Sequence, residues 1–88
     1  MAVEFYKQAK QQRLPAYIKD QLLRATMSIA LNLAEGSAKP SLKDRVRFYT
    51  IALGSLREAQ SIIQLEQLKT LAEAADHLGA SLYKLVKQ

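Results

Sequence analysis

The chain has 88 residues, with 13 Lys and Arg against 8 Asp and Glu, a formal net charge of +5, and a 49% hydrophobic content. These values predict one small globular domain, residues 1–88, and exclude a disordered chain. The absence of cysteine excludes a disulfide framework and a thiolate nucleophile. With no targeting segment and no uncharged stretch long enough to span a bilayer, we expect a cytoplasmic protein without membrane contact.

The first two predicted helices differ in length. The first covers Ala2–Gln12 and is short, because proline disfavours helix at the residue before it and Pro15 follows closely. The second begins at Pro15 or Ala16, since proline suits a first helical position, and runs to Glu35. Gly36 is expected to stop it, as glycine often does at a helix C-terminus.

Two further helices complete the chain. Ser41 is a favourable N-cap for a third helix from about Leu42 to Leu65. The Thr70–Glu73 segment fits a capping box that opens a fourth helix, which ends near Val86. Because short loops between helices place them as antiparallel neighbours, we predict an all-α fold, an antiparallel four-helix bundle with a short first helix.

The second helix is apolar on nearly opposite sides. One stripe consists of Ile18, Leu22, Ala25, Ile29 and Leu33. The other consists of Leu23, Met27, Ala30 and Ala34. The third helix also has an apolar arc wider than one neighbour needs. We therefore expect copies of the chain to form a homo-oligomer that shares the burial of these faces.

Two motifs carry a family resemblance. Ser28–Gly36 reads SIALNLAEG, and Ile51–Glu58 reads IALGSLRE after Phe48 and Tyr49. Over about Gln21–Gln60 the chain resembles the small four-helix-bundle proteins encoded in intervening sequences of large-subunit ribosomal RNA genes. It is also similar to the accessory variability proteins of diversity-generating retroelements.

This resemblance implies a four-helix bundle that assembles into a homo-oligomer, pentameric in the characterised relatives, with a basic surface that engages nucleic acid. In the retroelement branch it implies that the oligomer also binds a reverse transcriptase. Relatives usually open with a longer first helix that carries a tryptophan, whereas this chain has no Trp.

Polar residues of the second and third helices are predicted to form a structural polar cluster. Its members are Arg24, Ser28, Asn32, Glu35, Ser55 and Glu58. Pairing the two helices outward from their loop brings Arg24 to the serines in a buried or half-buried site, with Glu58 within its reach. The same pairing places Glu35 near Lys43 and Arg45. Because no titratable nucleophile joins them, these groups are interpreted as fixing helix register.

Neither a metal site nor a catalytic site is predicted. Glu73, Asp76 and His77 come nearest to a metal-binding motif, but they face away from the apolar seam of the fourth helix and toward water. The chain has no second histidine and no phosphate-cradling glycine loop. We therefore expect no cofactor and no enzymatic activity.

A row of cations along the third helix is the candidate nucleic-acid-binding site. It consists of Lys39, Lys43, Arg47 and Arg57. Such a row is often only a solvated helix face, but with the net charge of +5 and the resemblance, phosphate contact is favoured. No aromatic residue is interleaved, which favours contact with the nucleic-acid backbone over base reading.

The sequence thus predicts a non-enzymatic, homo-oligomeric accessory protein that binds RNA or an RNA–DNA hybrid. The alternative is a protein-interaction scaffold whose basic surface docks a partner such as a reverse transcriptase.

Overall fold

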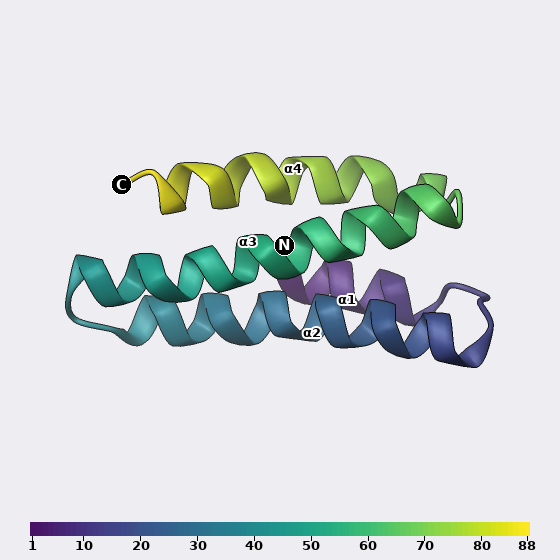
Figure 1. Cartoon of the computed structure of the whole chain (residues 1–88), viewed down its shortest axis with the longest axis horizontal. Coiled ribbons are helices and arrows are strands. Elements are labelled where there is room, and N and C mark those ends of the chain that lie inside the picture. The colour runs from purple at the N-terminus through teal and green to yellow at the C-terminus, as the bar shows by residue number, and fades with distance from the viewer.

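The computed structural model describes all 88 residues and contains four helices and no strand (Figure 1). The helices are α1 (Ala2–Lys10), α2 (Ala16–Ala38), α3 (Leu42–Leu65) and α4 (Lys69–Val86). The all-α class and the short first helix are as predicted. None of the four helices combines the length and the hydropathy needed to cross a bilayer.

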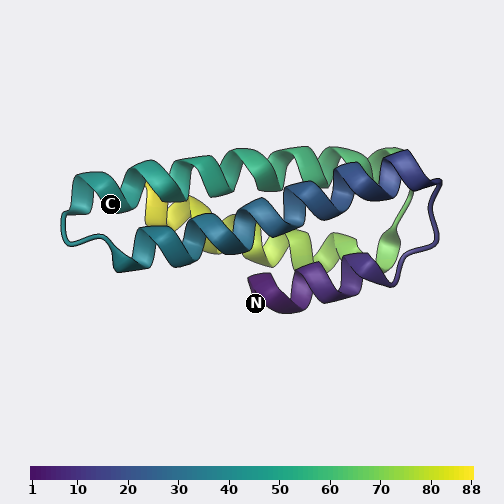
Figure 2. The same ribbon diagram turned by 90° about the horizontal axis from the view of Figure 1, so that it is seen from below.

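The central element is α3, which lies beside both α2 and α4 (Figure 1). The chain turns back after α2 so that α3 returns along it, and it turns back again before α4. The short α1 packs against α2 and α4, and Figure 2 shows that it covers only the N-terminal part of α2. The remaining length of α2 therefore has no first-helix neighbour.

The hydrophobic core draws on all four helices. Its largest fully buried apolar side chains are Phe5, Leu22, Ile29, Leu56, Leu71 and Leu82. Thr26 is the one buried polar residue, and its hydroxyl donates to the Leu23 carbonyl oxygen at 3.2 Å. Because every buried side-chain N or O atom has a partner, the core carries no unpaired polar group.

The end of α2 differs from its prediction. The helix continues past Gly36 to Ala38, and Gly36 is buried against α3. A Cβ atom at this position would lie 2.7 Å from Cε1 of Tyr49 and 3.2 Å from Cβ of Phe48. Gly36 therefore permits a close approach of the two helices and does not stop α2. The first helix also ends two residues early, at Lys10.

The start of α4 also differs, because α3 ends in a tight turn. The Leu68 N–H donates to the Ile63 carbonyl at 2.9 Å, and the Gln67 N–H donates to the Gln64 carbonyl at 3.3 Å, which is the Schellman pattern. Thus α4 begins at Lys69 without a side-chain cap, and the predicted capping box does not form. By contrast, the N-cap predicted for α3 is present: the Ser41 side chain accepts from the backbone of the third helical residue.

Gln67 adopts φ 55°, the only positive φ in the chain. This left-handed conformation costs a residue with a Cβ atom about 1–2 kcal/mol, and glycine relieves most of that cost. We expect Gln67→Gly to raise the free energy of unfolding by about 0.5–1 kcal/mol, measured by urea denaturation. The matched control is Gln64→Gly, at a helical position, which should lower it by about 0.5–1 kcal/mol. Equal losses in both variants would contradict the turn geometry.

Candidate nucleic-acid interface

The exposed side of α3 carries cations separated by small residues. We call this side the basic face; it consists of Lys43, Arg47, Thr50, Gly54, Arg57 and Ser61, all of which are exposed. At 100° per residue these positions fall within about 80° of the helix circumference. Its outermost cations, Lys43 and Arg57, are about 21 Å apart along the axis. The basic face is therefore a narrow, nearly straight strip.

The three cations of the basic face have no acidic partner within the chain. The two ion pairs of the structure join other residues, Glu4 to Lys7 and Glu35 to Lys39. The guanidinium of Arg57 donates from Nη1 to Oε1 of Gln60 at 2.7 Å, which orients it without neutralising its charge. The basic face consequently presents uncompensated positive charge to an anionic ligand.

Lys39 lies at the loop end of this face but differs from the other three cations. Its Nζ is 3.3 Å from Oε2 of Glu35 and 5.2 Å from the centroid of the Phe48 ring. The guanidinium of Arg47 lies 5.0 Å from the same ring, so the ring holds both cations near the α2–α3 loop. Because its charge is shared with Glu35, Lys39 is a weaker candidate for phosphate contact.

Glu35 was expected near Lys43 and Arg45, but its carboxylate forms an ion pair with Lys39 instead. The cause is the length of α2: its continuation to Ala38 places Lys39 four residues beyond Glu35, the spacing at which helix side chains meet. Arg45 instead donates to the carbonyl oxygens of residues 39 and 40, at 3.1 and 3.0 Å.

Half of the predicted polar cluster comes together. The hydroxyls of Ser28 and Ser55 lie 2.7 Å apart, and Nδ2 of Asn32 donates to the Ser28 carbonyl oxygen at 2.8 Å and to its Oγ at 3.1 Å. All three residues are half-buried. These bonds join α2 to α3 through short side chains, which suits the predicted role in helix register.

Arg24 and Glu58, by contrast, do not join this cluster. Both are exposed, and neither forms an ion pair or a side-chain hydrogen bond. An exposed ion pair contributes about 0–1 kcal/mol, which does not compensate for desolvating two full charges and ordering two long side chains.

Apolar side chains flank the Ser28–Ser55 hydrogen bond on the outer side of the α2–α3 contact. Leu31 follows Ser28 by three residues and is 60% exposed, and Ile51 precedes Ser55 by four and is 48% exposed. These spacings keep each pair on one helix side. The chain turns back between α2 and α3 (Figure 1). The helical rise therefore puts Leu31 and Ile51 each about one turn from the Ser28–Ser55 hydrogen bond, on its loop side. We call these four residues the outer seam.

Comparison with known proteins gives one result. A model of the 23S rRNA-intervening sequence protein family matches residues 1–88. The chain belongs to this family. The match extends over all four helices, beyond the Gln21–Gln60 range of the sequence resemblance. No curated protein and no solved structure matches the chain.

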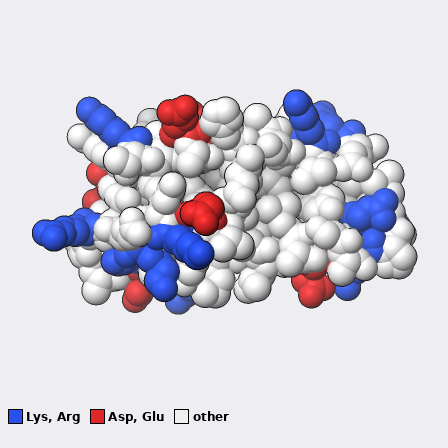
Figure 3. Space-filling model, turned by 180° about the vertical axis from the view of Figure 1, so that it is seen from behind, with Lys and Arg blue, Asp and Glu red and all other residues white.

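In this member of the 23S rRNA-intervening sequence protein family, charge is distributed differently on the side where α1 lies, opposite the basic face. Figure 3 shows Lys and Arg gathered toward the two ends of that side, with a largely uncharged middle. No continuous row of cations comparable to the basic face runs along it. The basic face of α3 is thus the more continuous positively charged strip.

Sequence reasoning missed a groove in this family member, between α3 and α4, with a volume of about 490 Å³. Its polar rim includes Gln60, Gln64, Gln67 and Asp76, and Gln60 Nε2 donates to Asp76 Oδ1 at 3.3 Å. The sequence signal was three glutamines at spacings of four and three, the interval that places them on one helix side. Asp76 and His77 are exposed, as predicted for residues that face water.

Proposed function

We propose that this member of the 23S rRNA-intervening sequence protein family is a non-enzymatic accessory protein that binds nucleic acid through the basic face. The observation that carries the proposal is the row of three exposed cations on α3 without acidic partners. RNA is the preferred ligand, with an RNA–DNA hybrid as the next candidate, because the family's name connects it with the intervening sequences of 23S rRNA.

The binding mechanism is neutralisation of phosphates. Each phosphate that pairs with Lys or Arg releases condensed counterions, and this release favours the complex at low salt. The small residues Thr50, Gly54 and Ser61 leave the cations as the tallest groups of the basic face. A sugar–phosphate backbone can therefore approach the helix closely, and Gly54 has no atom within 4 Å of where a Cβ would lie.

We further infer that the four helices form an antiparallel bundle and that copies of it associate through the outer seam. Large contiguous exposed apolar patches often mark association sites. Leu31 and Ile51 are both exposed, and the register set by the Ser28–Ser55 hydrogen bond brings them to the same level of the α2–α3 contact. Association places several basic faces in one particle, and each additional face raises the effective affinity for a long polyanion. The resemblance suggests five subunits.

A salt series tests the binding proposal. Fluorescence anisotropy of labelled RNA and DNA oligonucleotides should show tight binding at low ionic strength. A plot of log affinity against log salt concentration should have a slope of about −2 to −3 per engaged subunit, because each subunit contacts about three phosphates. Failure to bind any nucleic acid at low salt would refute the proposal. It would favour the alternative function, in which the basic face docks a protein partner such as a reverse transcriptase.

The outer seam gives a separate prediction about assembly. The double variant Leu31→Gln, Ile51→Gln should convert the oligomer to smaller species in multi-angle light scattering, since both apolar contacts are lost without a change of charge. A matched control is Val3→Gln with Tyr83→Gln, which are 57% and 50% exposed on other helices. If light scattering shows that the wild-type protein is a monomer, the assembly proposal is refuted. The binding proposal does not depend on that result, because the salt series tests it separately.

A further inference from the structure

Two rows of exposed residues run along the outer side of the α2–α3 contact and extend the outer seam toward the far ends of both helices. Within each row the residues are seven positions apart, a spacing that returns an α-helix to within about 20° of the same side. The α2 row consists of Tyr17, Arg24 and Leu31. The α3 row consists of Ile51, Glu58 and Leu65. All six side chains are exposed, with Tyr17 at 73% and Leu65 at 79%. We call these six residues the outer rows.

The outer rows lie opposite each other, level by level. The Ser28–Ser55 hydrogen bond fixes the register of α2 against α3, and α3 runs back along α2 (Figure 1). Arg24 lies four residues before Ser28 in the chain. Glu58 lies three residues after Ser55, so both charges are about one turn from the bond on the side away from the loop. The same count gives two further pairs, Leu31 with Ile51 and Tyr17 with Leu65. The outer rows therefore form three layers about 10.5 Å apart, and the charged layer lies between an aliphatic and an aromatic–aliphatic one.

The middle layer carries two opposite charges that are not paired within the chain. Arg24 and Glu58 form no ion pair and no side-chain hydrogen bond. Heptad spacing of large apolar residues is the pattern by which one helix surface packs against another. A charge covered by such packing needs an opposite charge facing it, because an unpaired desolvated charge is strongly destabilising. The middle layer offers one charge of each sign, so it is complementary to itself.

A second copy of the chain satisfies the middle layer in only one of the two orientations that align the three layers. When the copies point in the same direction, α2 of one lies over α3 of the other, and each Arg24 meets a Glu58. When they point in opposite directions, α2 lies over α2, and like charges meet. The other two layers do not discriminate, because they pair large apolar or aromatic side chains in both orientations. Since facing like charges are strongly disfavoured at an interface, the middle layer selects the parallel orientation.

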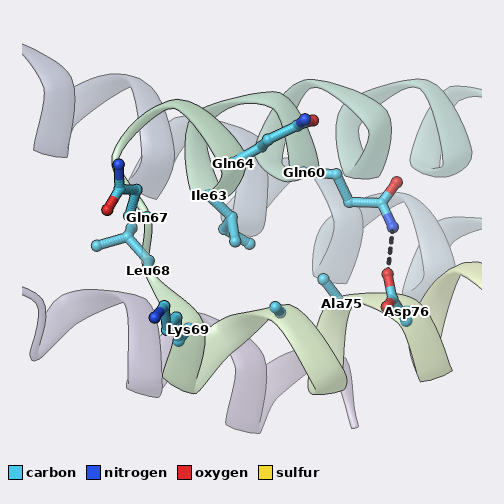
Figure 4. Close-up of a pocket in the computed structure, with 9 residues that line it drawn as sticks. Gln60, Ile63, Gln64, Gln67, Leu68, Lys69, Ala75 and Asp76 are labelled. Atoms are coloured by element: carbon cyan, nitrogen blue, oxygen red, sulfur yellow. Dashed lines mark hydrogen bonds between the residues drawn. The ribbon is translucent and has the colours of Figure 1, made fainter.

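A copy docked on the outer rows leaves the basic face accessible. Around α3, the basic face lies between the α3 row and the flank that α4 covers. Figure 4 shows that flank, where Gln60 of α3 donates to Asp76 of α4. Because the docked copy approaches from the other side of the basic face, both surfaces can be used at once. Parallel copies also have basic faces that run in the same direction.

We propose that the outer rows bind a second copy of this chain in the parallel orientation, with Arg24 of one subunit paired with Glu58 of the next. This inference rests on the assembly described in the proposed function, and it adds the paired residues and the direction of the subunits. The flanking layers exclude water from the ion pair, so the pair contributes chiefly to register and partner choice. The pairing holds in a dimer and in a ring whose symmetry axis runs along the helices, because both keep equal levels together.

Charge reversal tests the pair. Arg24→Glu alone, or Glu58→Arg alone, places like charges on the middle layer and should raise the dissociation constant of the assembly at least about a hundredfold. The double variant Arg24→Glu, Glu58→Arg restores the pair with its sense reversed and keeps the net charge of +5, so it should assemble as the wild type does. An equimolar mixture of the two single variants should also associate. Multi-angle light scattering of nuclease-treated full-length protein measures these states, and circular dichroism verifies folding.

Matched controls separate the pair from net charge. Lys84→Glu changes the net charge from +5 to +3, as Arg24→Glu does, and Glu73→Arg changes it to +7, as Glu58→Arg does. Both control positions are exposed on α4, away from the outer rows, and both variants should assemble normally. The ion pair is refuted if the single reversals assemble like the wild type. It is equally refuted if neither the double variant nor the mixture reassembles.

Disulfide trapping tests the orientation without altering the charges. The chain has no cysteine, so introduced thiols are the only ones present. In a parallel assembly, Tyr17→Cys protein mixed with Leu65→Cys protein should form a disulfide between the two variants under mild oxidation, identified by mass. Tyr17→Cys mixed with Leu31→Cys should not, because those positions face each other only between antiparallel copies. The reverse result would refute the parallel orientation.

The outcomes separate this inference from the proposed function. If the wild type assembles but the reversals have no effect, the ion pair is refuted while assembly and nucleic-acid binding stand. If the wild type is a monomer, both the pair and the assembly are refuted, and the salt series still decides nucleic-acid binding. If the wild type assembles but binds no nucleic acid at low salt, the binding proposal is refuted, and the reversals still decide the pair.

Discussion

Replacement of Lys43, Arg47 and Arg57 together by glutamate is expected to lower RNA affinity at least about a thousandfold, to below detection at physiological salt. The formal net charge shifts by six units, from +5 to −1. More importantly, every cation of the basic face without an acidic partner becomes a repulsive carboxylate next to the phosphates. Fluorescence anisotropy against RNA, with circular dichroism to verify helix content, measures the effect.

The same triple variant should remain folded. All three side chains are exposed, and substitutions at such positions usually change stability by less than about 0.5 kcal/mol each. Lys43→Glu even places a carboxylate in the first turn of α3, where the helix dipole favours it. A melting temperature within a few degrees of the wild type would therefore accompany the loss of binding.

A second triple variant separates the basic face from net charge. Lys10, Arg13 and Lys84 are exposed elsewhere in the molecule, and their replacement by glutamate produces the same net charge of −1. This control should weaken RNA binding far less, because the phosphate contacts on α3 remain. Equal losses in the two variants would show that the chain attracts polyanions only through its overall charge, and the basic face would lose its assigned role.

The sequence predicted those features of the fold that depend on local patterns. The bounds of α3, Leu42–Leu65, match the prediction, because Ser41 caps the helix and the apolar periodicity ends where the helix does. Other ends were mispredicted where tertiary contacts decide. Gly36 has the sequence signature of a helix stop. In the structure, however, glycine is needed there because the Tyr49 ring of α3 occupies the space that a Cβ atom would take.

The candidate site divides in the same way. Exposure of the basic face follows from helical periodicity alone, so Lys43, Arg47 and Arg57 could be placed on one side of a helix in advance. The exposure of Arg24 could not be predicted in this way. The free energy of a solvated Arg24 differs too little from that of Arg24 in a weak exposed ion pair for a sequence pattern to decide between them. The α3–α4 groove depends on how two helices pack, and Gln67 shows no sign of its left-handed backbone in the sequence.

Gly36→Ala is expected to lower the free energy of unfolding by about 1–3 kcal/mol, although alanine is the better helix former by about 1 kcal/mol. The added Cβ would lie 2.7 and 2.9 Å from two ring carbons of Tyr49, which is buried and cannot move without disturbing α3. Gly54→Ala is the matched control, because a Cβ there meets nothing within 4 Å. It should raise stability by about 0.5–1 kcal/mol, so urea denaturation should show opposite signs for the two variants.

A double-mutant cycle assigns the Gly36→Ala loss to one contact. With Tyr49→Leu as background, the ring carbons are absent, and Gly36→Ala should cost much less than it does in the wild type. An undiminished cost would place the clash elsewhere, for example at Cβ of Phe48, 3.2 Å away. Displacement of Phe48 would also move its ring away from Lys39 and Arg47. Gly36→Ala should then weaken RNA binding slightly, which connects the close helix approach to the position of the basic face.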